Sequence, residues 1–303
     1  MLSSLALKNA PPTKQPYAYK ASAGAPESFE LTGKDEAEAL DFLAKRPLQT
    51  VFMSGLIRDN GIVSALNRGT FYASRDDYGE ITGIALIGHA TIIEARTPAA
   101  LKAFAYLTQN NRRAAHMILG ESAQISGLWQ LYAGTGRRAR RICREALLEQ
   151  RYSTEEHEVV HGLRCATLAD LAHVMPVQAQ MAFAESTVNP MDVDPLGFRL
   201  RCARRIEQDR VWVWIEDGRL RFKADIMADT HGVIYLEGIY VAPEDRGRGY
   251  GLRCLSQVSR NLLLRAQSVC LLVNEHNQPA LNFYRRAGFK LRNHFDMIYL
   301  QQT

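Results

Sequence analysis

Residues 237–251 read EGIYVAPEDRGRGYG, and residues 252–266 continue as the amphipathic stretch LRCLSQVSRNLLLRA. The apolar residues before the glycines predict a strand, and the recurring leucines after them predict a helix with one apolar face. A glycine-rich turn between a strand and a helix exposes successive backbone N–H groups, and the positive end of the helix dipole points at the same place. The stretch therefore predicts a pyrophosphate site, with the charges of Arg246 and Arg248 beside it.

Other phosphate-binding turns are also rich in glycine, but their surroundings differ. A dinucleotide-binding turn opens a βαβ unit and precedes a ribose-binding acid. The strand here instead follows a hairpin that turns at Asp217-Gly218. A P-loop ends in Gly-Lys-Ser or Gly-Lys-Thr, which residues 237–251 do not contain. We therefore exclude both classes.

The rest of the chain predicts an α/β (α+β) fold in which two halves follow the same order of elements. In the C-terminal half the patterns predict strands at 164–166, 211–216, 220–226, 233–241 and 269–273, helices at 168–185, 195–208, 251–266 and 277–287, and final strands within 289–300. In the N-terminal half they predict a helix from Asp35, strands within 70–95, a helix opened by Thr97-Pro98, a strand at 115–119, a helix at 122–132 and a strand pair near 138–148.

This order predicts the division of the chain. Residues 1–33 are rich in Pro, Ala, Ser and Lys and are expected to form a flexible arm. Residues 34–152 are expected to form an α/β domain and residues 153–303 a second one, with the polar stretch 149–161 as the linker. A duplication, with the first domain as a degenerate copy, is an open alternative.

Composition limits the class of protein. Of 303 residues, 47% are hydrophobic and 23% charged, and the apolar runs are too short to span a bilayer. Residues 1–22 lack the features of a secretory signal. The five cysteines are dispersed without metal-ligand spacing, as expected of reduced thiols. We therefore expect a cytoplasmic protein with no metal and no membrane partner.

The net charge of +5 would attract polyanions in general. Arginines are densest over residues 137–144, where Ile142 interrupts them as in a half-exposed strand. We expect a charged sheet edge there, because such charges oppose aggregation. No zinc-finger or aromatic RNA-binding motif accompanies the arginines, so a nucleic acid is not an expected partner. The sequence leaves open whether the protein forms a homodimer.

Two motifs together resemble the signatures of the GNAT superfamily of N-acetyltransferases. The sequence VAPEDRGRGYG at 241–251 is similar to the pyrophosphate signature Arg/Gln-x-x-Gly-x-Gly/Ala after a Val-x-Pro strand exit. The sequence NQPALNFYRRAGF at 277–289 is similar to the second signature, Asn-x-x-Ala-x-x-x-Tyr-x-x-x-Gly-Phe. The resemblance covers roughly residues 158–303. More loosely, VFMSGLIRDNG at 51–61 resembles the uncharacterised domain that precedes GNAT in some bacterial proteins.

The resemblance implies a mixed, mostly antiparallel sheet flanked by helices, and acetyl-CoA as the co-substrate. The strand backbone around Ile239, Tyr240 and Val241 would pair with the pantetheine arm and polarise the thioester carbonyl. Asn277 would hydrogen-bond to the same arm. The pyrophosphate would be held by Arg246, Gly247, Arg248, Gly249, Tyr250 and Gly251.

Tyr284 and Glu237 are the candidates for catalysis. The resemblance implies that Tyr284 lies near the sulfur and protonates the departing thiolate, and the alternative is a packed aromatic beside Phe283. Glu237 lies in an otherwise apolar strand, where an unpaired carboxylate is costly. The resemblance implies that it deprotonates the attacking amine, directly or through water. It could instead pair with Lys223 on the adjacent strand or hold the substrate.

The expected function is transfer of an acetyl group to a primary amine by direct attack in a ternary complex. The amine could belong to a small molecule, a peptide or a protein lysine, and the acids of residues 185–194 would suit its positive charge. Asp194 before Pro195 is expected as a helix cap. The N-terminal half has Pro98 where a phosphate would need a donor, so we do not expect it to bind CoA. The alternative function is a non-catalytic acyl-CoA sensor or recruiting module.

Overall fold

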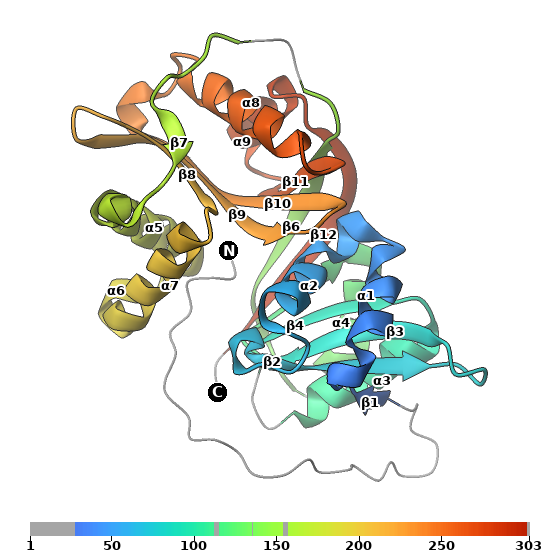
Figure 1. Ribbon diagram of the computed structural model, residues 1–303. Helices are drawn as coiled ribbons and strands as arrows, with labels where there is room; N and C mark the ends of the chain where they lie inside the picture. Colours follow the sequence, from blue (N-terminus) through green and yellow to red (C-terminus); the bar gives the residue numbers. More distant parts are fainter. Residues whose placement is uncertain (1–27, 112–114, 135, 154–156, 302–303) are drawn as a thin grey trace.

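The computed structural model describes residues 28–111, 115–134, 136–153 and 157–301 (Figure 1). The strands of the N-terminal half are β1 Ser28–Glu30, β2 Gly69–Arg75, β3 Ile81–Gly88, β4 Ala90–Ala95, β5 Met117–Glu121 and β6 Ala139–Gln150. Those of the C-terminal half are β7 Leu163–Cys165, β8 Val211–Glu216, β9 Arg219–Asp229, β10 Val233–Val241, β11 Ser268–Asn274 and β12 Lys290–Leu300.

The helices follow the same division. They are α1 Glu36–Ala44, α2 Pro47–Asn60, α3 Pro98–Asn110 and α4 Ser122–Ala133, then α5 Leu171–Ser186, α6 Pro190–Val193, α7 Pro195–Glu207, α8 Tyr250–Leu263 and α9 Gln278–Arg286. The described strands form one twisted sheet in the order β1-β2-β3-β4-β5-β12-β6-β11-β10-β9-β8-β7. Its pairs are antiparallel except β4 with β5 and β10 with β11. This confirms the mixed, mostly antiparallel fold class.

The two halves exchange their last strands. Strand β6, from the N-terminal half, pairs with β11 on one side, where Leu148 lies opposite Leu271. On its other side β6 pairs with β12, and β12 continues to β5, where Ile298 lies opposite Ile118. Each half therefore contributes a strand that the other half's part of the sheet needs for continuity.

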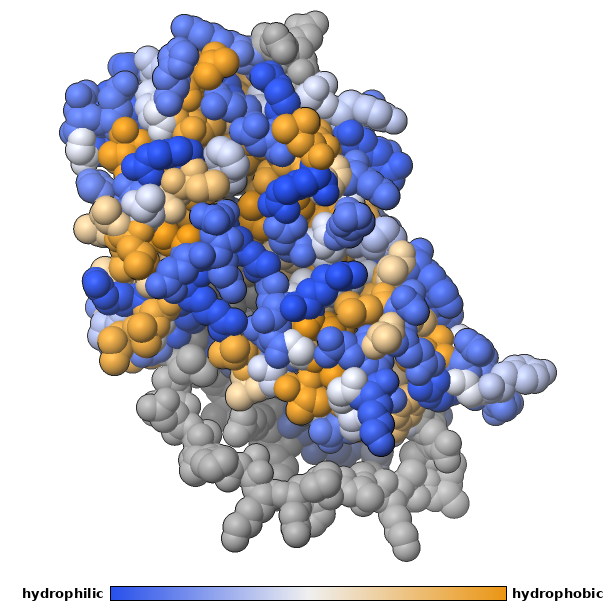
Figure 2. Space-filling view, in the orientation of Figure 1, coloured by the Kyte–Doolittle hydropathy of each residue, from blue (hydrophilic) through white to orange (hydrophobic). Residues whose placement is uncertain are grey.

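Helices cover both faces of the sheet. On one face, α8 and α9 pack on the C-terminal half and α3 and α4 on the N-terminal half. On the opposite face lie α1 and α2, followed by α5 and α7. The alternation of side chains along β6 supplies both cores, because Leu147 belongs to the cluster under α2 and Leu148 to the cluster under α8. Hydrophilic residues are spread over the surface seen in Figure 2, with hydrophobic residues among them.

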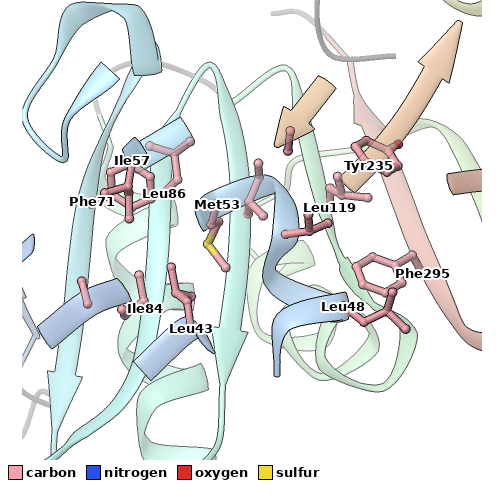
Figure 3. Packing of buried hydrophobic residues seen from close by; sticks show 14 of the residues in the cluster. Leu43, Leu48, Met53, Ile57, Phe71, Ile84, Leu86, Leu119, Tyr235 and Phe295 are labelled. Carbon is pink, nitrogen blue, oxygen red and sulfur yellow. The ribbon is translucent and has the colours of Figure 1, made fainter. Parts of the chain in front are cut away.

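Helix α2 joins the two halves. Its core cluster, shown in Figure 3, has Ile57 and Phe71 at one end and Leu48 beside Tyr235 and Phe295 at the other. Tyr235 and Phe295 come from β10 and β12 of the C-terminal half. The sequence patterns did not predict this helix.

A glycine and an ion pair fix the position of α2 against the C-terminal half. A Cβ added to Gly55 would lie 2.4 Å from Cβ of Ala228 on β9, so only glycine lets the helix approach that closely. At the end of the helix, Asp59 accepts two hydrogen bonds, of 2.5 and 2.6 Å, from the guanidinium of Arg210. A bidentate pair of this kind fixes both the distance and the orientation of the two elements.

Most expected elements are present, but four expectations need correction. Residues 139–148 belong to one strand, not a strand pair, and β6 is an interior strand, not a charged edge, because β11 and β12 both pair with it. The linker expected over 149–161 starts later, since Glu149 and Gln150 are buried in β6. Within the arm expected over 1–33, residues 28–30 form β1, and residues 1–27 lie outside the described residues.

No helix of the described residues is long and apolar enough to cross a membrane. The division into domains 34–152 and 153–303 stays a prediction, and the exchange of β6 and β12 makes it testable.

We expect that neither half, expressed alone with its boundary at residue 152, forms a native sheet, because residues 153–303 would lack β6 between β11 and β12. Circular dichroism and size-exclusion chromatography of each fragment, and of the two co-expressed, would measure this. The expected result is aggregation of the single fragments and recovery of a soluble complex on co-expression. A monomeric fragment of residues 153–303 with cooperative unfolding would contradict it.

Candidate acyl-CoA site

The glycine-rich turn has the backbone shape that an anion site requires. Gly247 and Gly249 have φ angles of +76° and +80°, in the left-handed region that side-chain-bearing residues rarely adopt. Gly249 is also the N-cap of α8, and no side chain caps this helix. The first N–H groups of a fourteen-residue helix therefore remain as donors at its positive end. A Cβ at either glycine would meet no described atom within 4 Å, so both backbones face open space.

Gly251 differs from these two glycines. A Cβ there would lie 2.8 Å from Cγ2 of Val241 and 3.3 Å from the ring of Phe283. Its missing side chain lets α8 approach β10 and α9, which is a packing role. Arg246 and Arg248 are exposed, and Arg246 Nε donates a hydrogen bond of 3.1 Å to the carbonyl oxygen of Val241.

Strands β10 and β11 separate just before this turn. Their parallel pairing runs from Val233 opposite Ser268 to Leu236 opposite Leu271 and then stops, although β10 continues to Val241. On its other side β10 stays paired with β9, and a bulge occurs between Glu237 and Tyr240. Gly238 makes this bulge possible with a φ of +62°. The backbone of β10 around Ile239 is therefore turned away from β11.

A buried ion cluster lies behind the bulge. Lys223 Nζ is 2.7 Å from Asp225 Oδ1, and Arg205 Nη1 is 3.1 Å from Asp225 Oδ2. A Cβ at Gly238 would lie 3.0 Å from both the Lys223 ammonium and the Asp225 carboxylate, so the charges fit only against a glycine. Burial lowers the pKa of Lys223, and Asp225 opposes that shift. Lys223 therefore has an ion-pair partner in Asp225, and the pair between Lys223 and Glu237 that the sequence left open stays an open alternative.

A cavity of about 270 Å³ lies where the strands separate. Its walls come from β10, β11, α9 and α5 of the C-terminal half and from β6 of the N-terminal half. The residues with functional groups on its lining are Arg141, Cys143, Glu145, Glu185, Tyr235, Glu237, Asn274, Asn277, Tyr284 and Tyr299.

Ile239 and three expected site residues with polar side chains line this cavity. Glu237 is half-buried on β10, at the bulge. Tyr284 extends from α9, with its ring 5.2 Å from that of Phe283 and 6.1 Å from that of Phe289. Burial raises the pKa of Tyr284, so its phenol stays protonated at neutral pH, as a proton donor must. Asn277 also lines the cavity, but its Oδ1 caps α9 by accepting the Ala280 N–H at 3.2 Å.

Other expected residues divide between the cavity and the surface. Glu185 lines the cavity from α5, on the side where the acceptor is expected. Asp194 is the N-cap of α7 and accepts the Gly197 N–H at 2.9 Å, as predicted. Tyr250 packs on the ring of Trp214 at 5.1 Å, near the start of α8.

The sequence patterns missed Glu145. This residue is 2% exposed on β6 and faces the cavity from the N-terminal half. Its Oε1 accepts a hydrogen bond of 3.3 Å from Asn274 Nδ2, and its Oε2 is buried with no hydrogen-bond partner among the described residues. Burial raises the pKa of Glu145 to about 7, because desolvation disfavours the charged form. In the sequence, Glu145 lies two residues from both Cys143 and Leu147, which indicates that its side chain shares their face of a strand. The sequence did not show that this strand would border the cavity of the other half.

The corresponding separation of strands in the N-terminal half is filled. Strands β4 and β5 pair only as far as Ile92 opposite Leu119. Arg46 occupies the space beyond, with Nη1 3.0 Å from Glu94 and Nη2 in contact with Glu121. The start of α3 is capped by its own Thr97 side chain. These contacts occupy the gap and one end of α3, and the expectation that this half does not bind CoA stays a prediction.

Comparisons with known proteins agree with this geometry. Residues 219–298 match the model of the FR47-like protein family. The chain is 36% identical over 80 residues to the peptidyl-lysine N-acetyltransferase YiaC of Escherichia coli (strain K12), which covers 26% of this chain and 49% of that protein. The chain therefore spans about half the length of this curated relative.

Solved structures extend the likeness over both halves. A GCN5-related N-acetyltransferase from Sphaerobacter thermophilus superposes with a TM-score of 0.58 at 14% identity, over 90% of this chain and 94% of that one. A tandem GNAT protein from the clavulanic acid biosynthesis pathway superposes with a TM-score of 0.56 at 14% identity, over 90% and 97%. The fold is that of GNAT proteins, and the resemblance of the C-terminal half to GNAT is confirmed. The looser resemblance of residues 51–61 stays a prediction.

A substitution in the glycine-rich turn, compared with one at a distant glycine of similar φ, would distinguish a loss of ligand binding from the effect of backbone strain. We expect acetyl-CoA to raise the melting temperature of the protein, and Gly249→Val to abolish this shift, because the side chain would strain a positive φ and block the approach of a phosphate. Differential scanning fluorimetry with and without acetyl-CoA measures the shift. The matched control is Gly79→Val, at a φ of +85° in the distant β2–β3 turn, which should retain it. An unchanged shift in Gly249→Val would place the nucleotide elsewhere.

Proposed function

We propose that this protein transfers an acyl group, in the simplest case acetyl, from acyl-CoA to a primary amine by direct attack in a ternary complex. The observation that carries the proposal is the gap between β10 and β11. On one face of the sheet lies the uncapped start of α8, and on the other lie the carboxylates of the cavity. A ligand with its phosphates at α8 can reach those carboxylates only through the gap.

Acyl-CoA would be bound mainly by backbone groups and to a lesser extent by side chains. The N–H groups of the turn from Arg246 to Gly251 would hold the pyrophosphate. The freed edge of β10 at Ile239 and Val241 would pair with the amide groups of the pantetheine arm, since β11 leaves that edge unpaired. Asn277 would offer its Nδ2 to the same arm, because its Oδ1 already caps α9. These roles follow the GNAT resemblance and fit the positions of the residues.

The chemistry would need three proton transfers. Glu237 would take a proton from the incoming ammonium, directly or through water, so that the free amine can attack the thioester carbonyl. The backbone N–H groups at the bulge would stabilise the oxyanion of the tetrahedral intermediate. As the carbon–sulfur bond breaks, Tyr284 would give its proton to the thiolate, and the phenolate would recover one from the new amide nitrogen. The products are an amide, CoA thiol and one proton, which Glu237 would release to water.

The acceptor side favours a cationic amine. Of the lining residues that the structure describes, Glu145, Glu185 and Glu237 are acidic and Arg141 alone is basic, so acids outnumber bases there. A lysine side chain, the group named for the YiaC relative, carries such an amine. Small primary amines satisfy the same requirement, and a panel that spans both would identify the acceptor.

We expect Tyr284→Phe to lower kcat by up to about a hundredfold, the scale of general acid catalysis, with little change in acetyl-CoA affinity. A thiolate leaves easily, so the loss would fall toward the lower part of that range. Steady-state thiol release and calorimetric titration of acetyl-CoA measure the two effects. Tyr132→Phe, at a buried tyrosine of α4, controls for the loss of a hydroxyl in a core. Full turnover in Tyr284→Phe, with chemistry rate-limiting, would remove this residue from the mechanism.

We expect Glu237→Gln to keep acetyl-CoA binding and to lower turnover at neutral pH, with partial recovery as pH rises and more of the amine is already deprotonated. Glutamine preserves the shape and removes the charge, so a loss of packing would not explain the effect. The pH dependence of kcat/KM for the acceptor measures it. A variant that equals wild type at every pH would make Glu237 a structural carboxylate. Acetyl-CoA binding without thiol release for any amine would instead favour the non-catalytic sensor.

A further inference from the structure

Glu145 is a buried carboxyl group that the proposed reaction does not use. It lies on β6 with its side chain on the same face of the sheet as those of Cys143 and Leu147, the face that carries Tyr235 of β10. Its neighbour across the strand pair is Asn274, which supplies its hydrogen bond to Oε1. The other oxygen, Oε2, faces no donor among the described residues. A buried carboxyl oxygen without a partner is costly, and a donor that binds in the cavity would remove that cost.

Glu145 and Glu237 stand on opposite sides of one strand. Residue 236 pairs with Leu271 of β11, and Glu145 pairs with Asn274, further along the same strand. Neighbouring strands lie about 4.8 Å apart, so the two backbones are separated by roughly 10 Å across the sheet. Side chains rise approximately perpendicular to a sheet, and the separation of β10 from β11 adds to the distance. One ammonium group is therefore poorly placed to contact both carboxylates.

The charges on the cavity wall favour a second cation over a neutral group. Among the described residues of the lining, three carboxylates face one guanidinium, and none of these residues is a lysine or a histidine. Arg141 stands four residues before Glu145 on β6 and donates a hydrogen bond of 3.4 Å to the backbone oxygen of Glu185. A cation beside Oε2 would provide a charge partner for Glu145 that no ion pair within the described chain provides.

We propose that Glu145 binds a second, non-reacting cationic nitrogen of the acceptor, so that the acceptor is a diamine or a related compound with two amino groups. The inference rests on the proposed function, in which Glu237 receives the reacting amine. It assigns the N-terminal half a direct role in acceptor specificity, because β6 carries Glu145 into the cavity of the other half.

The test compares amines that differ by one nitrogen. Isothermal titration calorimetry of the full chain, saturated with CoA, would measure binding of α,ω-diamines from 1,3-diaminopropane to 1,6-diaminohexane against the monoamine of the same chain length. Acetyl-CoA turnover with the same amines is the second readout. We expect the best diamine to bind at least about tenfold more tightly than its monoamine, and Glu145→Gln to remove that preference while monoamine binding is unchanged.

Two variants guard against a folding artefact. Glu149→Gln is the matched control, because Glu149 lies on the same strand, is equally buried at 2% exposure, and pairs with Arg151 and Arg292 outside the cavity lining. It should lose stability but keep the preference for the diamine. Glu145→Asp keeps the charge on a shorter side chain and should restore part of the preference.

The outcomes separate this inference from the proposed function. A diamine that binds through Glu145 but is not acetylated would refute the proposed function and leave the inference standing. Equal binding of diamines and monoamines by wild type would overturn the inference, whatever the turnover. An equal loss of both classes of amine in Glu145→Gln would also overturn it, and would make Glu145 a group that serves the reacting amine.

Discussion

The exchange of β6 and β12 is the constraint on which the rest of the structure depends. A strand inside a sheet must satisfy its backbone N–H and C=O groups on both sides, and β11 finds its second partner only in the other half of the chain. Because of the exchange, both of these cores contain residues from both halves of the chain, since successive residues of β6 enter the clusters under α2 and under α8. It is the reason why Glu145, a residue of the N-terminal half, lies in the cavity of the C-terminal half.

The opening between β10 and β11 depends on a second constraint, the buried ions behind Gly238. A charged lysine with no exposed surface is tolerated only beside its counter-ion, and Asp225 provides that partner on the same strand. The side chains need the volume that a Cβ at position 238 would take. The bulge that follows turns β10 away from β11, so a feature that resembles core packing creates the backbone edge that pantetheine would use.

The sequence predicts the C-terminal half far better than the junction between the halves. Local signals determine the hairpin at Asp217-Gly218, the cap at Asp194 and the turn at Gly249, because each depends on residues a few positions apart. The partners of β6 are set by packing between segments more than a hundred residues apart, which no periodicity reveals. The arginines suggested an edge because charged residues protect edges. On β6 the arginines instead belong to an interior strand. Glu145 was overlooked because, on an edge strand, an acid among arginines would be an ordinary surface residue.

The two halves share an order of elements but differ in what occupies the gap in each. In the N-terminal half Arg46 pairs with Glu94 and Glu121, and Thr97 caps α3, so the charges at the gap and the start of this helix already have partners. In the C-terminal half the corresponding helix has no side-chain cap and Glu145 Oε2 has no partner within the described chain. Unsatisfied groups are costly in a stable fold and are retained where a ligand completes them. The asymmetry therefore favours the C-terminal half for the proposed ligand, to which the other half would contribute a strand, a helix and one acid.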